Sequence, residues 1–227
     1  MLVLVNQTAF SALQASDIRT HLNITDTSTD AYIQSLIDAA VVYCERITGL
    51  DLRPTTWNLV LGQFPIWANY SWGDRYGNYL SLFPYLNEFA IGRDLQRWQE
   101  ILLPRGPVTA VNSIKYYDVT NALQTLPTSS YNVVLPSYTA GRIEPNIYWQ
   151  LAYPRPDAVT VSFTSGFSNN SGDVNYIPQT LIHAVKLLVG LWWNQREDIN
   201  YDPRTVQGNV GMAVDSLLST FRPALYR

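Results

Sequence analysis

The chain has 227 residues, of which 47% are hydrophobic and 15% charged, and this composition excludes an intrinsically disordered protein. Fifteen Lys and Arg against eighteen Asp and Glu give a net charge of −3. A protein that binds nucleic acid through its phosphates normally carries an excess of Lys and Arg, so the charge argues against that class. The lone cysteine excludes an internal disulfide.

No targeting or membrane segment is predicted. The N-terminus MLVLVNQTAF has no positively charged region, so it does not resemble a signal peptide. No apolar run reaches the length of about 18 residues that a membrane-spanning helix needs.

Two short elements are expected before the first long helix. The apolar residues 1–6 predict an edge strand or an arm that lies on a neighbour. Ser16 is the expected N-cap of a short helix over residues 17–22.

The first long helix is predicted over residues 29–49. Ser28 or Thr29 can cap its start, and Gly49 stands where a left-handed C-terminal cap belongs. Pro54 then blocks further helix. The apolar side chains that share one face of this helix are Ile33, Leu36, Ile37, Ala40, Val41, Cys44 and Ile47.

From Thr55 to Gly166 the period changes to two, which predicts an antiparallel β region of roughly six or seven strands in a small sandwich or curled sheet. Besides the strand that begins at Thr55, the expected strands cover residues 101–103, 111–119, 123–126, 131–135, 141–144 and 159–163.

Residues 64–99 interrupt this β region with many aromatic side chains and no clean period. Three interpretations remain open: a local hydrophobic cluster on the sheet, a contact surface for a protein partner, and a sugar-stacking surface. The candidate partner-facing aromatic residues are Trp67, Trp72, Tyr76 and Tyr79.

The second long helix is predicted over residues 178–197, with Pro178 as its first residue. Apolar side chains cover about two thirds of its circumference, so it must be covered on more than one side. The helix at 29–49 and the sheet can cover part of it, and a second copy of the protein can cover the rest. The candidate inter-subunit residues are Leu187, Leu191 and Trp193.

A short amphipathic helix over residues 212–221 is expected to close the chain. It can pack on its own domain, or it can bind a groove on a partner. The candidate residues for such docking are Val214, Leu217, Leu218, Phe221 and Arg222.

Catalytic chemistry finds little support in the sequence. His21, His183 and Cys44 show no metal-ligand spacing, and no nucleophile or phosphate-binding motif occurs. A carboxylate pair for glycoside cleavage stays open, since Asp and Glu are always available, and the candidates are Glu88, Asp94 and Glu100 near the aromatic segment. We therefore expect no enzyme, no cofactor and no metal.

The order of these features resembles the head–tail connector (adaptor) proteins of tailed bacteriophages and gene transfer agents. The resemblance rests on segments spread over nearly the whole chain: the short leading helix, YCERITG at 43–49, LRPTTW at 52–57, ILLPRGPV at 101–108, RPDAVTV at 155–161, the second long helix, and VDSLL at 214–218 with Phe221 and Arg222. The aromatic segment 64–99 departs from the family pattern, which has only a few residues there.

The resemblance implies a virion structural protein, usually twelve copies in a ring between the portal and the stopper or tail. Genome DNA would pass through the ring without sequence-specific binding, and the C-terminal segment would dock on the portal. Assembly would take place in the host cytoplasm. The alternative function is a carbohydrate- or receptor-binding virion module that uses the aromatic segment.

The predicted fold is α+β. A helical bundle of two long and two short helices combines residues 1–53 and 177–227, and this part would form the ring. An antiparallel β-rich domain, residues 54–176, is inserted between the two halves of the bundle.

Overall fold

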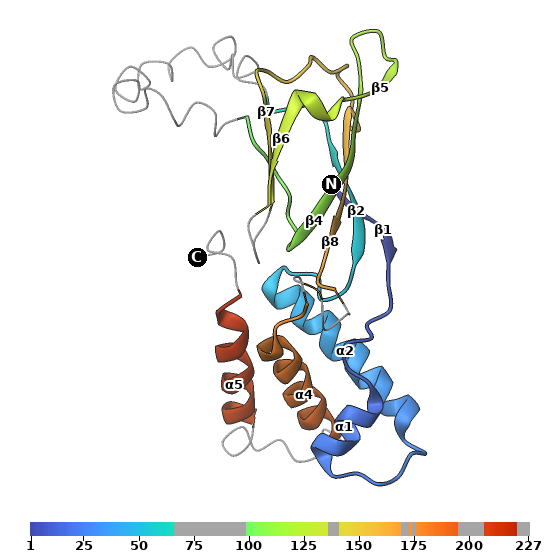
Figure 1. Ribbon diagram of the computed structural model, residues 1–227, viewed down its shortest axis with the longest axis vertical. Coiled ribbons are helices and arrows are strands. Elements are labelled where there is room, and N and C mark those ends of the chain that lie inside the picture. The colour runs from blue at the N-terminus through green and yellow to red at the C-terminus, as the bar shows by residue number, and fades with distance from the viewer. Residues whose placement is uncertain (66–98, 136–140, 169–172, 174–175, 195–206, 222–227) are drawn as a thin grey trace, which may run out of the picture.

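The computed structural model describes residues 1–65, 99–135, 141–168, 173, 176–194 and 207–221. The molecule is elongated, with helices at one end and strands at the other (Figure 1). The mixed helical and antiparallel composition agrees with the predicted α+β class. In chain order the elements are β1 (Leu2–Gln7), α1 (Ala15–Leu22), α2 (Asp30–Thr48), β2 (Thr55–Leu61), β3 (Ile101–Leu102), β4 (Val108–Tyr117), β5 (Leu123–Thr125), the 3₁₀ turn η4 (Thr128–Ser130), β6 (Tyr131–Val134), β7 (Arg142–Pro145), β8 (Val159–Ser165), α4 (Gln179–Asn194) and α5 (Gln207–Ser219).

The ends of α2 follow the sequence closely. Gly49 adopts a φ of 71°, and its backbone N–H donates to the carbonyl of Glu45, as expected of a left-handed cap. Thr29 is the N-cap residue, but its side chain makes no capping hydrogen bond. The start of α2 is instead held to α1 by an ion pair between Arg19 and Asp30 at 2.8 Å.

The cap of α1 differs from the prediction. Gln14 is the N-cap, and Ser16 lies inside the first turn. The reason is a reciprocal pair of bonds, in which the backbone N–H of Gln14 donates to the carboxylate of Asp17 at 2.9 Å while the Gln14 side chain bonds the backbone of Asp17.

The helical core joins the two ends of the chain. Helices α2 and α4 pack on each other, and α1 and α5 pack against this pair. Apolar side chains from α1, α2, α4 and α5 form one buried cluster, including Ile18, Ile37, Val185 and Leu218, each 5% exposed or less. The predicted pairing of the two long helices is therefore present.

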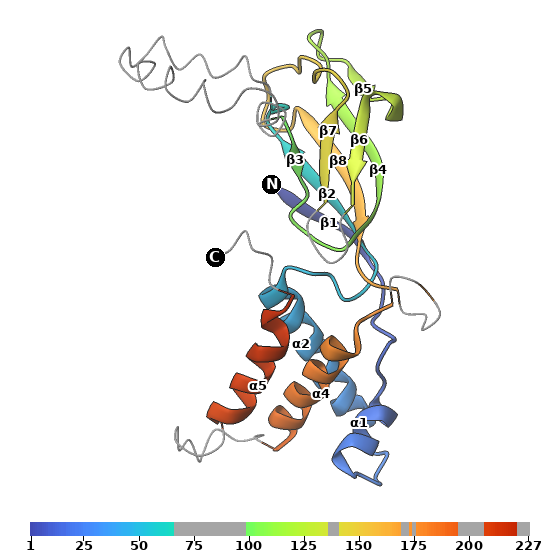
Figure 2. The ribbon, with the colours of Figure 1, turned by 60° about the vertical axis from the view of Figure 1, so that its left-hand side comes forward.

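The β part consists of two sheets (Figure 2). One has five strands in the order β1-β2-β8-β4-β5, and the other has three in the order β3-β7-β6. Every pairing between these strands is antiparallel. A second buried cluster, which includes Leu59, Ile114, Val161 and Phe163, forms the core of this part.

The structure corrects the assignment of the first residues. The domain division predicted from the sequence assigned residues 1–53 to the helical part. In the structure, however, β1 pairs with β2 and forms one edge of the five-stranded sheet. The edge-strand interpretation of residues 1–6 is thus confirmed, in a different part of the molecule. Its location depends on a partner strand more than fifty residues away, which no local pattern reveals.

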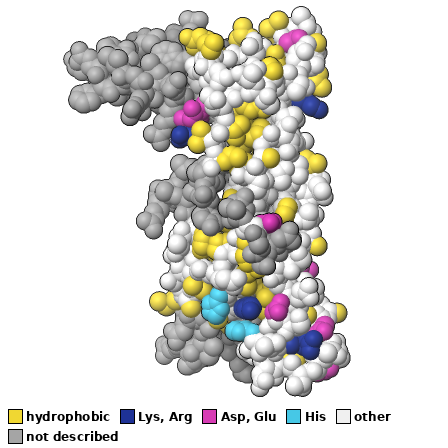
Figure 3. All heavy atoms as spheres, viewed as in Figure 1, with side chains coloured by type: hydrophobic (Ala, Val, Ile, Leu, Met, Phe, Trp, Pro, Cys, Tyr) yellow, Lys and Arg dark blue, Asp and Glu magenta, His cyan; other side chains and the backbone are white. Residues whose placement is uncertain are grey.

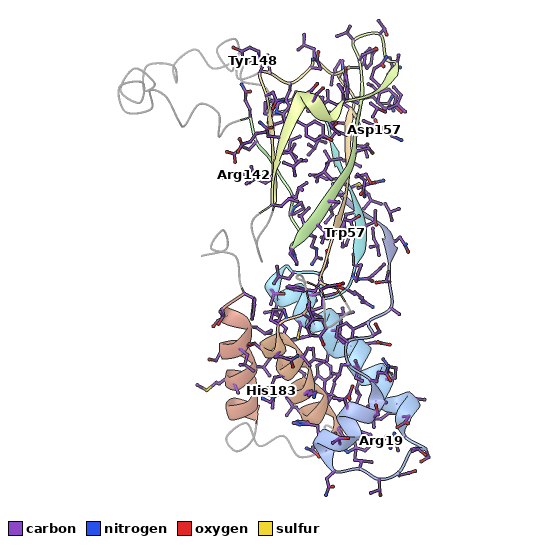
Figure 4. All side chains as sticks on the ribbon, viewed as in Figure 1. Arg19, Trp57, Arg142, Tyr148, Asp157 and His183 are labelled. Atoms are coloured by element: carbon purple, nitrogen blue, oxygen red, sulfur yellow. The ribbon has the colours of Figure 1, made fainter. Side chains whose placement is uncertain are left out.

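Within the described residues the chain crosses between the two parts three times, and the second and third crossings meet at a buried polar cluster around Asp51, which is 1% exposed. The indole N–H of Trp57 donates to its carboxylate at 2.8 Å, and the hydroxyl of Ser165 donates to the same oxygen. Arg105 lies 3.8 Å from the other carboxylate oxygen and donates to the carbonyl of Glu45 at 3.2 Å. Figure 4 shows Trp57 at this junction.

Gly166 is required where two crossings touch. Its φ is +114°, and a Cβ there would lie 2.1 Å from the carbonyl oxygen of Arg53. Only glycine allows the end of β8 to pass so close to the backbone that leads into β2.

Candidate assembly surfaces

The second long helix is not sealed within the single chain. Leu181, Val185 and Val189 are fully buried, whereas Leu187, Leu191 and Trp193 are only half-buried, and Leu187 and Trp193 pack in part on the helical core. The three candidate inter-subunit residues therefore keep apolar surface in contact with solvent, which a partner can cover.

Aromatic residues extend this surface onto α2. Tyr32 packs against Trp193 with ring centroids 5.9 Å apart, and Tyr43 packs edge-to-face on Trp192 at 6.2 Å. Tyr32 and Tyr43 are 43% and 41% exposed, and the neighbouring Val42 is 52% exposed. We call Tyr32, Tyr43, Trp192 and Trp193 the aromatic strip. Trp and Tyr are enriched as anchors in protein interfaces, so this strip is suited to one.

Helix α5 uses part of its predicted docking face for its own fold. Val214 and Leu218 are 3% and 0% exposed and belong to the helical core. Leu217 and Phe221 are half-buried against the same core, and Arg222 lies outside the described residues. For Val214 and Leu218, the structure favours packing on the protein's own domain, which was the other interpretation open from the sequence.

The candidate aromatic residues Trp67, Trp72, Tyr76 and Tyr79 lie outside the described residues. The two ends of their segment are described, and both meet one side chain, Trp149. Phe64 is fully buried and stacks on Trp149 with centroids 4.9 Å apart and planes 7° apart. The indole N–H of Trp149 donates to the carbonyl of Gln99 at 2.6 Å.

Sequence reasoning missed Trp149. It lies between Pro145 and Pro154 in a stretch without helical or strand periodicity. A tryptophan in such a stretch is itself a signal, because so large an apolar ring is rarely left fully in water. The far end of the β part carries exposed apolar groups beside it: Ile147 is 77% exposed, Tyr148 75% and Leu151 63%. Figure 4 labels Tyr148 at this end.

Among the described residues, the histidine, cysteine and acidic side chains named as candidates do not come together in one reactive site. His21 and His183 lie side by side with ring centroids 6.4 Å apart, as Figure 3 shows on the helical surface. Within the described ranges, no group of three or more His, Cys, Asp or Glu could hold a metal ion. Glu100 is half-buried at the start of β3, and the other two candidate carboxylates, Glu88 and Asp94, lie outside the described residues.

Cys44 is a core residue. Its side chain is fully buried on α2, and burial raises the pKa of its thiol to about 12. The thiolate, which is the reactive form, is therefore strongly disfavoured at neutral pH. Among the described helices, none is long and apolar enough to cross a membrane.

The comparison with protein families matches residues 13–71 to the family described as phage gp6-like head-tail connector protein. The resemblance to head–tail connector proteins is confirmed. The matched residues include α1, α2 and β2, so the connector-like region spans the first long helix and the first crossing into the sheet. The match covers about a quarter of the chain, and what it implies for the role of the protein is taken up below.

The whole fold is similar to three solved chains. The first comes from the "Neck of empty GTA particle computed with C6 symmetry", at 21% identity and a TM-score of 0.66. The second comes from the "Neck of native GTA particle computed with C12 symmetry", at 22% and 0.65, and the third from the "Virion of native gene transfer agent (GTA) particle", at 22% and 0.66. Each match covers 99% of this chain and 96% of the other. No curated protein matches the chain.

Proposed function

We propose that this protein is a head–tail adaptor that forms a ring, twelve copies in the simplest case, between the portal and the stopper or tail of a phage-like particle. The observation that carries the proposal is the surface of the helical part, where half-buried Leu187, Leu191 and Trp193 adjoin the exposed rings of Tyr32 and Tyr43. Such a surface on an otherwise well-packed bundle is typical of a subunit interface. The similarity in fold to chains from necks solved with C6 and C12 symmetry supports the same arrangement.

In this proposal the ring surrounds a channel through which genome DNA passes without sequence-specific contacts. The net charge of −3 fits a channel that does not hold the phosphates. A strongly basic channel wall in the assembled ring would contradict this part of the proposal.

The C-terminal segment is the proposed portal contact. Because Val214 and Leu218 lie in the core, the contact would use the solvent side of α5 and the residues after it, beginning with Arg222. A deletion from Ser216 onwards would also remove Leu218 from the core and confuse folding with docking. The sharper truncation stops after Phe221.

The test mixes purified protein with purified portal and follows the complex by native mass spectrometry and electron microscopy. We expect the full chain to form rings on the portal, and we expect the chain truncated after Phe221 to fold but lose the complex. Thr128→Ala, an exposed change in η4 and outside α5, is the control and should dock normally. A full-length chain that never associates with the portal or with itself would refute the adaptor role. A monomer in the absence of portal would not, since the portal can template the ring.

A further inference from the structure

The central part of the outward face of the five-stranded sheet carries a single charge, and beyond it Arg155 lies over the ring of Tyr117, the next residue of this face along β4. The strand register defines three rows of side chains that run across this face. In order from β1 towards β5, the rows are Asn6–Thr56–Thr164–Ala110, Val3–Asn58–Ser162–Ser113 and Val60–Thr160–Lys115–Thr125. Lys115, close to β5, is the one charged member of these rows.

The alternation along each strand identifies this as the outer face. In β8, Val159, Val161 and Phe163 are fully buried in the core of the β part, whereas the residues between them are half-exposed. In Figure 1, β6 and β7 lie to the left of β2, β8 and β4. We call the three rows the neutral face.

The neutral face continues to an open edge. Strand β1 pairs with β2 on one side and has no strand partner on the other within the described part of the chain. It carries no charged side chain and no proline, and Leu4 and Val5 are 48% and 55% exposed. Exposed edge strands are normally protected from pairing with another chain by charges, prolines or bulges. Of these, β1 has only the bulge near Val5.

A surface with so few charges is unusual where a protein faces water, but it is common in the core of a protein–protein interface. About a quarter to a third of the residues on a solvated surface are charged, and the cores of protein interfaces are depleted of charge. Copies that each carry a net charge of −3 repel one another, so they associate most readily through a face that adds no repulsion. DNA is a poor occupant, because phosphates require cations and the rows offer a single lysine.

We infer that the neutral face and the adjoining β1 edge are buried against a second copy of this chain. This inference rests on the proposed ring. Strand and residue spacings give the three rows an area of about 400 Å², roughly half of the patch that each partner contributes to a standard interface. In a closed ring of more than two copies the contact is head-to-tail, so the neutral face meets a different surface of its neighbour. The aromatic strip on the helical part then supplies a second, separate area of contact.

The test places a charge at the centre of the face. Ser162 lies in the middle row with Asn58 and Ser113 as its neighbours, so Ser162→Arg should leave the strand paired but put a cation into the contact. Thr128→Arg, at an exposed position in η4 outside the rows, is the matched control. Both variants are checked by circular dichroism and thermal unfolding, and ring formation with portal is then measured by native mass spectrometry.

We expect Ser162→Arg to weaken ring formation at least about tenfold and Thr128→Arg to leave it unchanged. Ring formation by the natural chain should not weaken from low to high salt, because the contact contains few charges and salt screens the repulsion between copies. If Ser162→Arg does not fold, Asn58→Arg on the adjacent strand takes its place.

Rings from Ser162→Arg that match those of the natural chain would overturn the inference and leave the adaptor role standing. Intact rings with newly gained DNA retention would overturn it as well, since the face would then line the channel. A natural chain that forms no ring even with portal would refute the proposed function, and this inference with it.

Discussion

At the scale of single residues, two glycines with positive φ are needed for different reasons: one for its backbone conformation alone, and the other also because a side chain has no room. Gly49 has a φ of +71° and open space where a Cβ would stand, whereas a Cβ on Gly166 would lie 2.1 Å from the Arg53 carbonyl oxygen. We expect Gly49→Ala to cost about 1 kcal/mol of unfolding free energy, the ordinary cost of a left-handed conformation. Gly166→Ala should cost clearly more, about 3 kcal/mol or above, because two crossings must separate. Urea unfolding of both variants measures the difference, and equal losses would refute the close approach.

Two buried carboxyl groups at the junction, those of Glu45 and Asp51, should make the free energy of unfolding depend on pH. Burial raises the pKa of Glu45 against the opposing charge of Arg53, and burial likewise raises the pKa of Asp51 against its bonds from Ser165 and Trp57. A raised pKa means that the folded chain binds protons more tightly than the unfolded chain. The contribution of these groups to stability is therefore fully present below their ordinary pKa, about 4, and is lost as pH rises through the raised values.

The expected result is an unfolding free energy whose slope against pH is more negative above pH 4 in the natural chain than in Glu45→Gln. Glutamine keeps an acceptor for the backbone N–H of Leu52, which now donates to Glu45 Oε1 at 3.1 Å. Asp118 is the opposite case, since hydrogen bonds from Thr120 and Gln124 lower its pKa to about 2. Asp118→Asn should change the slope only below about pH 4. Identical slopes for the natural chain and Glu45→Gln between pH 4 and 8 would contradict the burial argument.

At the scale of elements, substitutions in α5 can show whether its buried face stabilises the chain's own fold or binds a partner. Leu218 is fully buried and Met212 is 71% exposed on the same helix. Leu218→Ala should cost about 2–4 kcal/mol of unfolding free energy in the isolated chain, and Met212→Ala should change it by less than about 0.5 kcal/mol. Chemical denaturation measures both. A Leu218→Ala chain as stable as the natural one would return this face to a docking role.

Trp149 gives a second prediction for elements, because it holds both ends of the segment from 64 to 99. Trp149→Phe retains a ring to stack on Phe64 but removes the donor to the Gln99 carbonyl. We expect a loss of about 1 kcal/mol for Trp149→Phe and about 3–5 kcal/mol for Trp149→Ala. Thermal and urea unfolding compare the two, and equal losses would mean that the hydrogen bond, and not the stacking, dominates.

The elements differ in how far the sequence predicts them. Helix α2 is predicted almost to the residue: Gly49 caps its end through local backbone geometry, and Thr29 stands at its N-cap although its side chain makes no capping hydrogen bond. The membership of β1 in the sheet and the burial of Leu218 depend on partners far along the chain, and local patterns do not contain them. The inter-subunit role of Leu187, Leu191 and Trp193 stays a prediction, which rests on a helix that is apolar on two thirds of its circumference. Trp149 was missed because no period surrounds it.

At the scale of the whole molecule, the junction should make the two parts unfold together. Asp51 accepts hydrogen bonds from Trp57 and Ser165, and its backbone N–H donates to the carbonyl of Gly106 at 2.7 Å. Asp51→Ala leaves those buried side-chain donors without an acceptor, and it should convert a single calorimetric transition into two. Two transitions in the natural chain, unchanged by the substitution, would show that the parts are thermodynamically independent.

The three crossings also have a mechanical consequence. The connections run from β1 to α1, from α2 to β2 and from β8 to α4, so three covalent links bridge the junction in parallel. A pull that separates the strands from the helices is divided among three peptide backbones, and no single linker carries it alone. A subunit built in this way can pass tension along its length and stretch little while doing so.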